Sequence, residues 1–302
     1  MASDLGLQLP PDTIDAPHPR ERKALRPADY GWYVLLTVLS LVILFPIWIT
    51  LVRAMSNPST ALFRKPTLVP RDIQWDAFQN AWTQGNLGRP LLWSLGVTVV
   101  IVLAQTFTSI LAAYAFAFLQ FPLKRTLFVL TVATLLLPIE VTLLTNFKTF
   151  QNFGWATPNQ TGLQAFGALT IPFLATALGV FLIRQGFLGV PKELRDAAAL
   201  DGFGHLRFLL RIAVPVTRPI IASFILISTL STYNQYVWPR QVILNQSDQT
   251  IQLALKQFSQ TKLDAINLPF AAALIAAVPV VVLLIAFQRQ LIRGLTAGAV
   301  KG

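Results

Sequence analysis

The chain has 302 residues, of which 54% are hydrophobic and only 12% are charged. Soluble domains carry about 25% charged residues, so the composition excludes an ordinary soluble enzyme, a disordered chain and a typical nucleic-acid-binding domain, and it indicates a membrane protein. The sequence has no cysteine and two histidines, which excludes disulfides and thiolate metal sites, and we expect neither a metal nor a cofactor.

Residues 1–29 are polar and rich in proline, and they predict a disordered tail. Six apolar stretches follow that are long enough to cross a bilayer, which needs about 20 mostly apolar residues. They are 30–52, 91–119, 126–147, 162–183, 219–238 and 269–287. We therefore predict an all-α membrane protein, with a six-span domain over residues 30–288 and a short C-terminal tail over 289–302. The first stretch is too long for the apolar region of a signal peptide, so we expect it to be retained.

Charge in the connecting segments predicts the orientation. If the N-terminus is inside, the inside segments hold more Lys and Arg residues than the outside segments, although the outer loop over 53–90 weakens this bias. We therefore expect a multi-pass protein with both termini in the cytoplasm.

The spans contain few polar side chains. In the second stretch, Gln105, Thr106 and Tyr114 occupy polar interior positions, for which a role in helix packing is expected. Glu140, beside Pro138, is the single acid in the apolar stretches. Because an intramembrane charge is costly, Glu140 lines a polar path through the protein, faces an interface with a partner protein, or lies solvated or hydrogen-bonded near the outer end of its span.

The inside segment over 184–218 has an unusually organised core at 191–211. Pro191 suits the first position of a helix, three alanines follow, and Gly202 can end the helix in a left-handed conformation. A second short amphipathic helix is expected after it, with Arg207 and Arg211 on one face, and His205 is expected to be an exposed surface residue. The segment predicts a slim helix–turn–helix at the membrane surface, although a solvated connecting loop is the alternative.

The outer end of the fifth stretch carries four polar or aromatic residues. The adjacent amides of Asn234 and Gln235 suit either the binding of hydroxyl groups or hydrogen bonds between helices. Tyr236 and Trp238 suit the aromatic belt at a membrane interface, and Tyr236 is also a candidate for a solute path.

The spacing of the inside segment resembles a known signature. Asp196-Ala-Ala is followed after three residues by Gly202, and after nine more by Ile212-x-Val214-Pro215. This resembles the coupling-loop signature of ABC importer permeases, Glu-Ala-Ala-x3-Gly-x9-Ile-x-Leu-Pro, with Asp in place of Glu and Val in place of Leu. Asp is one methylene shorter than Glu, so an ion pair made by it would be weaker or arranged differently. Over about residues 30–297 the chain is similar to the second permease of maltose and sn-glycerol-3-phosphate importers.

The resemblance implies a type I importer-like bundle whose coupling helix docks on a separate ATPase subunit. It implies three kinds of partner besides the lipid bilayer: a homologous second permease, two ATP-binding subunits and an extracytoplasmic solute-binding protein, with no nucleic acid. The membrane would be the cytoplasmic membrane of a prokaryote. The residues implied for coupling are Glu193, Arg195, Asp196, Ala197, Ala198, Asp201, Gly202 and Pro215, and the candidate solute pathway comprises Glu140, Asn234, Gln235 and Tyr236.

The chain itself is not expected to be an enzyme, because it lacks the Gly-x-x-x-x-Gly-Lys-Ser/Thr phosphate loop. A carbohydrate or a polyol phosphate such as sn-glycerol-3-phosphate is the expected solute. No span carries Lys or Arg in its middle, which favours a neutral sugar or a phosphate site in the partner permease. The alternative is a stand-alone secondary transporter of a small polar solute, which would need an internal repeat and ion-coupling residues that the sequence does not show.

Overall fold

The computed structural model describes residues 27–57, 68–70, 72–258 and 265–297, and every regular element in these ranges is a helix. This confirms the predicted all-α class. The chain divides into two compact units, residues 1–48 and 49–302.

The first unit contains most of α1 (Pro27–Met55). Its side chains from Tyr30 to Phe45 are exposed, as expected of a helix that meets lipid or another protein. The hydroxyls of Thr37 and Ser40 donate to the backbone carbonyls of Tyr33 and Leu36, at 2.8 and 2.7 Å. The helix thus satisfies its own polar groups, which a membrane span requires.

Within the described residues, three helices are long and apolar enough to cross a membrane: α1, α4 (Gly88–Phe118) and α15 (Asn267–Ala297). Three further pairs of helical segments qualify when taken together but are bent by more than 40°. They are Lys124–Leu136 with Val141–Asn152, Gly162–Phe173 with Ala177–Leu188, and His205–Val216 with Arg218–Val242. Up to six spans result, in agreement with the predicted number.

The bends have local causes in the sequence. Pro138 precedes α6 (Ile139–Asn152) and cannot donate a backbone hydrogen bond, so α5 (Lys124–Ala133) does not continue into it. The segment η2 (Ile171–Phe173), which contains Pro172, separates α7 (Gly162–Thr170) from α8 (Ala177–Leu188). The third bend lies at Thr217, between Val216 and Arg218, just before Pro219. The predicted fifth span over 219–238 falls within the segment Arg218–Val242, which has a short interruption where α12 (Arg218–Tyr233) ends, the Asn234 side chain donates to the Leu230 carbonyl, and α13 (Val237–Val242) begins.

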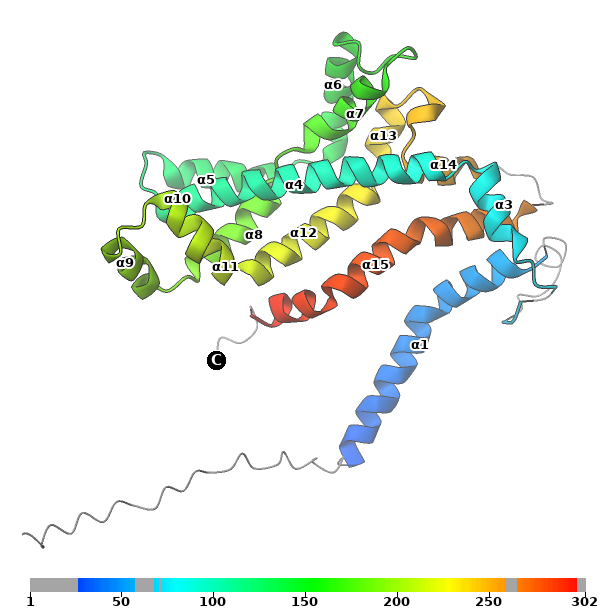
Figure 1. Ribbon diagram of the computed structural model, residues 1–302, viewed down its shortest axis with the longest axis horizontal. Helices are drawn as coiled ribbons and strands as arrows, with labels where there is room; N and C mark the ends of the chain where they lie inside the picture. Colours follow the sequence, from blue (N-terminus) through cyan, green and yellow to red (C-terminus); the bar gives the residue numbers. More distant parts are fainter. Residues whose placement is uncertain (1–26, 58–67, 71, 259–264, 298–302) are drawn as a thin grey trace, which may run out of the picture. The chain divides into compact units, whose positions relative to one another are not determined.

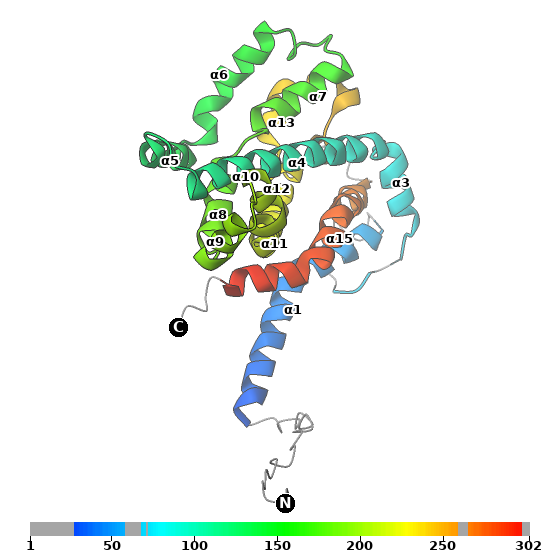
Figure 2. The same cartoon turned by 60° about the vertical axis from the view of Figure 1, so that its left-hand side comes forward.

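The long helix α4 organises the second unit. It packs against both α8 and α12, and α12 packs in turn against α15, which also contacts α3 (Asp76–Gln84). Figures 1 and 2 show α9 (Lys192–Leu200) and α10 (His205–Phe208) near the end of α4, and α13 and α14 (Ile251–Phe258) towards its beginning. The helix α4 therefore links the part of the unit that contains α9 and α10 with the part that contains α13 and α14.

Polar contacts join the helices around α4. The Gln105 amide donates to the Phe173 carbonyl at 2.8 Å and accepts from the Ser228 hydroxyl at 2.7 Å, which confirms the packing role predicted for Gln105. That role is wrong for Thr106, whose buried hydroxyl has no hydrogen-bond partner among the described residues. At the start of α4, Arg89 pairs with Asp248 at 2.9 Å, and the Asp248 side chain is only 3% exposed.

Close approach of α8 to its neighbours depends on Gly179. A Cβ atom there would meet the Ser109 hydroxyl of α4 and, at 2.6 Å, the ring of Phe224 on α12. We expect Gly179→Ala to destabilise the protein by about 1–3 kcal/mol because of this overpacking. Gly96→Ala is the matched control, since its Cβ would meet the Phe166 ring at 3.6 Å, an ordinary contact. Thermal unfolding of the purified variants in one detergent checks this; equal melting temperatures for the two variants would contradict it.

Candidate functional site

The segment predicted as a helix–turn–helix lies between α8 and α12. It contains α9 (Lys192–Leu200), α10 (His205–Phe208), the π-helical turn η3 (Leu209–Ala213) and α11 (Val214–Val216). Pro191 is the residue before α9 and not its first position. The second short helix predicted after this turn is present as the continuous helical segment His205–Val216, but it widens into a π turn before Pro215, which has no N–H to continue the ladder.

A glycine ends α9 as the sequence predicts. Gly202 has φ +73°, in the left-handed region. The Phe203 N–H donates to the Ala198 carbonyl at 2.8 Å, and the Gly202 N–H donates to the Ala199 carbonyl at 3.1 Å. This pair of bonds is the Schellman motif, which satisfies the last carbonyls of a helix through local backbone contacts.

The surface of α9 is almost entirely uncovered. Ala198 is its single buried residue, whereas Leu200 is 91% exposed and Leu194 is 42% exposed. The charged groups are also exposed, and the ion pair within the helix, between Arg195 Nε and Asp196 Oδ1, is long at 3.8 Å. A short helix that presents leucines and charges together to solvent has the properties of a surface that another protein covers.

The residues predicted for coupling lie in four places. Glu193, Arg195, Asp196 and Ala197 lie exposed on α9, and Asp201 and Gly202 lie exposed in the turn after it. Ala198 packs towards the aromatic residues at the end of α4, and Pro215 lies half-buried in α11. The structure therefore brings six of the eight onto one exposed element and its turn.

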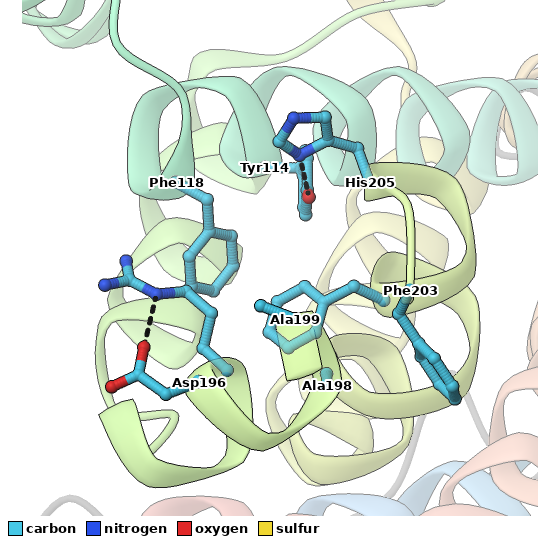
Figure 3. Close-up of a pocket in the computed structure, with 9 residues that line it drawn as sticks. Tyr114, Phe118, Asp196, Ala198, Ala199, Phe203 and His205 are labelled. Atoms are coloured by element: carbon cyan, nitrogen blue, oxygen red, sulfur yellow. Dashed lines mark hydrogen bonds and ion pairs between the residues drawn. The ribbon is translucent and has the colours of Figure 1, made fainter. Parts of the chain in front are cut away.

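A cavity of about 280 Å³ lies behind α9. Figure 3 shows Asp196, Ala198 and Ala199 on one side of it, with Phe118, Tyr114 and His205 on the other. The Tyr114 hydroxyl and the His205 Nδ1 atom are hydrogen-bonded at 3.0 Å. His205 is exposed, as predicted, but its bond to Tyr114, 91 residues away in the chain, had no signal in the sequence.

A second cavity, of about 330 Å³, lies where α4, α8 and α12 meet beside the helix breaks. All of its lining residues are uncharged, and four of the polar ones, Thr176, Ser231, Thr232 and Gln235, come from the ends of helices or the turns beside them. The remaining lining residues are Gln105, Phe173, Leu178, Phe224, Ile227 and Ser228. Hydroxyl and amide groups around an aromatic ring suit a neutral, hydroxylated molecule.

The other candidate pathway residues lie elsewhere. Asn234 is exposed and accepts from the Gln252 amide at 3.2 Å. The Tyr236 hydroxyl accepts from Arg240 at 3.0 Å. Glu140 lies in the first turn of α6, and its side chain is outside the described part of the structure.

The interfacial position predicted for Trp238 is wrong. Trp238 is 2% exposed, and its indole N–H donates to the Ala168 carbonyl at 2.9 Å. Trp238 lies in α13, beyond the interruption that follows Tyr233, and its ring packs against Phe150 and Phe173 inside the protein.

Comparisons with known proteins agree with this fold. Residues 105–297 match the family described as "Binding-protein-dependent transport system inner membrane component". The sn-glycerol-3-phosphate transport system permease protein UgpE of Yersinia pestis bv. Antiqua is 30% identical over 278 residues, which cover 89% of this chain and 96% of that protein. The protein of the same description from Yersinia enterocolitica is 32% identical over 279 residues, with the same coverage.

A solved structure is also similar. It is described as the crystal structure of a bacterial ABC transporter involved in the import of the acidic polysaccharide alginate. The TM-score is 0.73 at 18% sequence identity, over 88% of this chain and 98% of that chain. At this level of identity the likeness shows the fold.

The helix end at Gly202 can be tested directly. We expect Gly202→Val to strain the turn by about 1–2 kcal/mol, since a β-branched residue disfavours the left-handed region. Amide hydrogens of α9 should then exchange with solvent several times faster. Gly204→Ser is the matched control, because Gly204 has φ −73° in an extended conformation that serine adopts readily. Equal exchange in both variants would contradict the proposed role of the left-handed turn.

Proposed function

We propose that this chain, which belongs to the family of inner membrane components of binding-protein-dependent transport systems, forms one half of the translocation pathway of an ATP-driven importer. It is the permease component and not the ATPase subunit. Because the chain belongs to this family, we reject the alternative of a stand-alone secondary transporter. The observation that carries the proposal for this chain's own residues is the uncovered helix α9.

The complete transporter, in our proposal, contains this permease, a homologous second permease, two ATP-binding subunits and an extracytoplasmic solute-binding protein. Residues 30–288 form the membrane domain, and the tails over 1–29 and 289–302 both lie in the cytoplasm. The excess of Lys and Arg in the segments between the second and third spans and between the fourth and fifth supports this orientation. It also places α9, which lies in the latter segment, on the side where ATP is available.

The docking surface for the ATPase subunit is α9 with the turn that follows it, over residues 192–204, within the predicted coupling loop over residues 191–211. Three consecutive alanines make the helix slim enough to enter a groove, and Glu193, Arg195 and Asp196 supply charges that can fix its register there. The exposed Leu200 supplies apolar area. The two hydrogen bonds that end α9, from the Gly202 and Phe203 N–H groups, keep α9 helical before any partner covers it.

The solute pathway passes the uncharged cavity at the broken spans. Gln235 lines this cavity, and Asn234 and Tyr236 flank Gln235 in the chain. Glu140 remains a candidate because it follows the break of the third span. Broken helices commonly line polar paths through membrane proteins, because irregular backbone is tolerated where water or a solute can satisfy it.

The proposed solute is a carbohydrate or a polyol phosphate. The relatives named for sn-glycerol-3-phosphate transport make that compound the first candidate. The uncharged cavity supports contact of this chain with the hydroxyl groups of the solute. A phosphate group would then be bound by cations of the second permease or of the binding protein.

Reconstitution tests the proposal. The complex in proteoliposomes should hydrolyse ATP faster when its binding protein is loaded with solute, and we expect stimulation by sn-glycerol-3-phosphate above that by glycerol or maltose. Stimulation by maltose alone would indicate that the transported solute is a neutral sugar and not sn-glycerol-3-phosphate. The absence of any co-purifying ATPase subunit would contradict the importer complex.

Charge reversal on α9 should uncouple transport. We expect Asp196→Lys to reduce solute uptake about tenfold or more, because a like charge replaces an attraction at the docking surface, and Gly202→Asp to act in the same direction. Membrane insertion should be unchanged. Asp76→Lys in α3 is the matched control, because it makes the same charge change at an exposed position on another element. Wild-type uptake in both α9 variants would contradict the docking role.

Removal of the Gln235 amide should weaken the binding of solute in the transport pathway. Because an unpaired hydroxyl of the solute would face the cavity, we expect Gln235→Leu to raise the solute concentration for half-maximal uptake by about tenfold. Gln79→Leu on the exposed side of α3 makes the same chemical change and should have no effect. An unchanged concentration dependence in Gln235→Leu would place the solute path elsewhere.

A further inference from the structure

The helix α9 has little direct contact with the rest of the protein. Ala198 is its single buried residue, and a cavity of about 280 Å³ separates α9 from the end of α4. The turn that follows contains Gly202 and Gly204, and nothing lies within 4 Å of the position that a Cβ atom would take at either glycine. A force on α9 could therefore be absorbed by this turn and the hollow behind it, because glycine permits wide backbone motion.

The first residue after that turn is held in place. His205 begins α10, and its Nδ1 atom is hydrogen-bonded to the Tyr114 hydroxyl of α4 at 3.0 Å (Figure 3). Tyr114 itself is 7% exposed, and its ring packs against Phe118, Phe187 and Phe208, with centroid distances of 5.2, 6.5 and 6.4 Å. A hydroxyl fixed by such an aromatic cluster is a rigid attachment point.

From Tyr114 the connection continues along α4 to the uncharged cavity. Gln105 lies nine residues earlier on the same helix, about 14 Å away at the rise of an α-helix. Its side chain bonds both the Phe173 carbonyl at the break of the fourth span and the Ser228 hydroxyl of α12. One continuous helix therefore joins the neighbourhood of α9 to the helix breaks.

We propose that the Tyr114–His205 hydrogen bond is a positioning contact for energy coupling, which makes α4 follow the displacement of α9. The proposal rests on the function proposed above, in which α9 docks on the ATPase subunit. Without this bond, movement of α9 would be taken up by the glycine turn and the cavity. Tyr114 and His205 contact neither ATP nor solute in this account; they act through α4.

The test uses the assembled complex with its binding protein in proteoliposomes, and it measures ATP hydrolysed and solute imported in the same sample. In Tyr114→Phe and in His205→Leu, we expect basal ATP hydrolysis and subunit assembly to be retained. The amount of solute imported per ATP should fall about fivefold or more, the size of a typical coupling between two sites. The double variant should be no worse than either single variant, because both remove the same interaction.

Two further variants separate positioning from general stability. His205→Asn keeps a polar atom near the position of Nδ1 and should restore import per ATP to near the wild-type value. Tyr233→Phe removes a buried tyrosine hydroxyl elsewhere, the one that donates to the Ala276 carbonyl at 2.7 Å, and should leave import per ATP unchanged. Because His205 is exposed, His205→Leu keeps the test valid even if Tyr114→Phe lowers the yield.

The contradicting outcomes are distinct. Wild-type import per ATP in Tyr114→Phe and His205→Leu would overturn the proposal, and so would additive losses in the double variant or an equal loss in Tyr233→Phe. If Asp196→Lys lowers uptake while these variants do not, only the positioning role fails. If Asp196→Lys also has no effect, the docking of α9 fails with it.

Discussion

Backbone groups inside a membrane must find hydrogen-bond partners within the protein, and the arrangement around α4 follows from that constraint. The fourth span is broken near Phe173, which frees carbonyl groups there. Gln105 donates to the Phe173 carbonyl, and Thr108 donates to the Leu174 carbonyl at 3.1 Å. Both donors belong to α4, so an irregular span is stable because a regular helix beside it supplies the missing partners. The same break creates the uncharged cavity.

The broken fourth span depends on a neighbouring helix for its stability. In contrast, the helical conformation of α9 depends on its own sequence and not on contacts with the rest of the protein. Proline before the helix, alanines within it and a left-handed glycine after it give a stable short helix with a bare surface. A locally determined helix can move as a body, and α4 is the element that connects this body to the broken spans. Energy input at α9 and solute passage at the breaks thus depend on the same helix.

The sequence is informative where structure is local or periodic. Apolar length predicts the spans, and the proline and glycine positions predict α9 and its end at Gly202. It is uninformative where the packing of separate segments decides which residues meet. Gln235 lines the cavity while the adjacent Asn234 does not, and Trp238 is buried, beside the interruption between α12 and α13. The contact between Tyr114 and His205 depends on how separate spans pack, and no single-sequence pattern indicates it.

The central claim, that α9 inserts into the ATPase subunit, can be tested with one cysteine because the chain has none of its own. Leu200→Cys places a thiol on a residue that is 91% exposed on α9, and Leu163→Cys, at an 83% exposed position in α7, is its control. In the assembled complex, a short bifunctional crosslinker should join Leu200→Cys to the ATP-binding subunit and leave Leu163→Cys unlinked. Full reactivity of Leu200→Cys towards a soluble maleimide in the complex, with no crosslink to that subunit, would contradict the account.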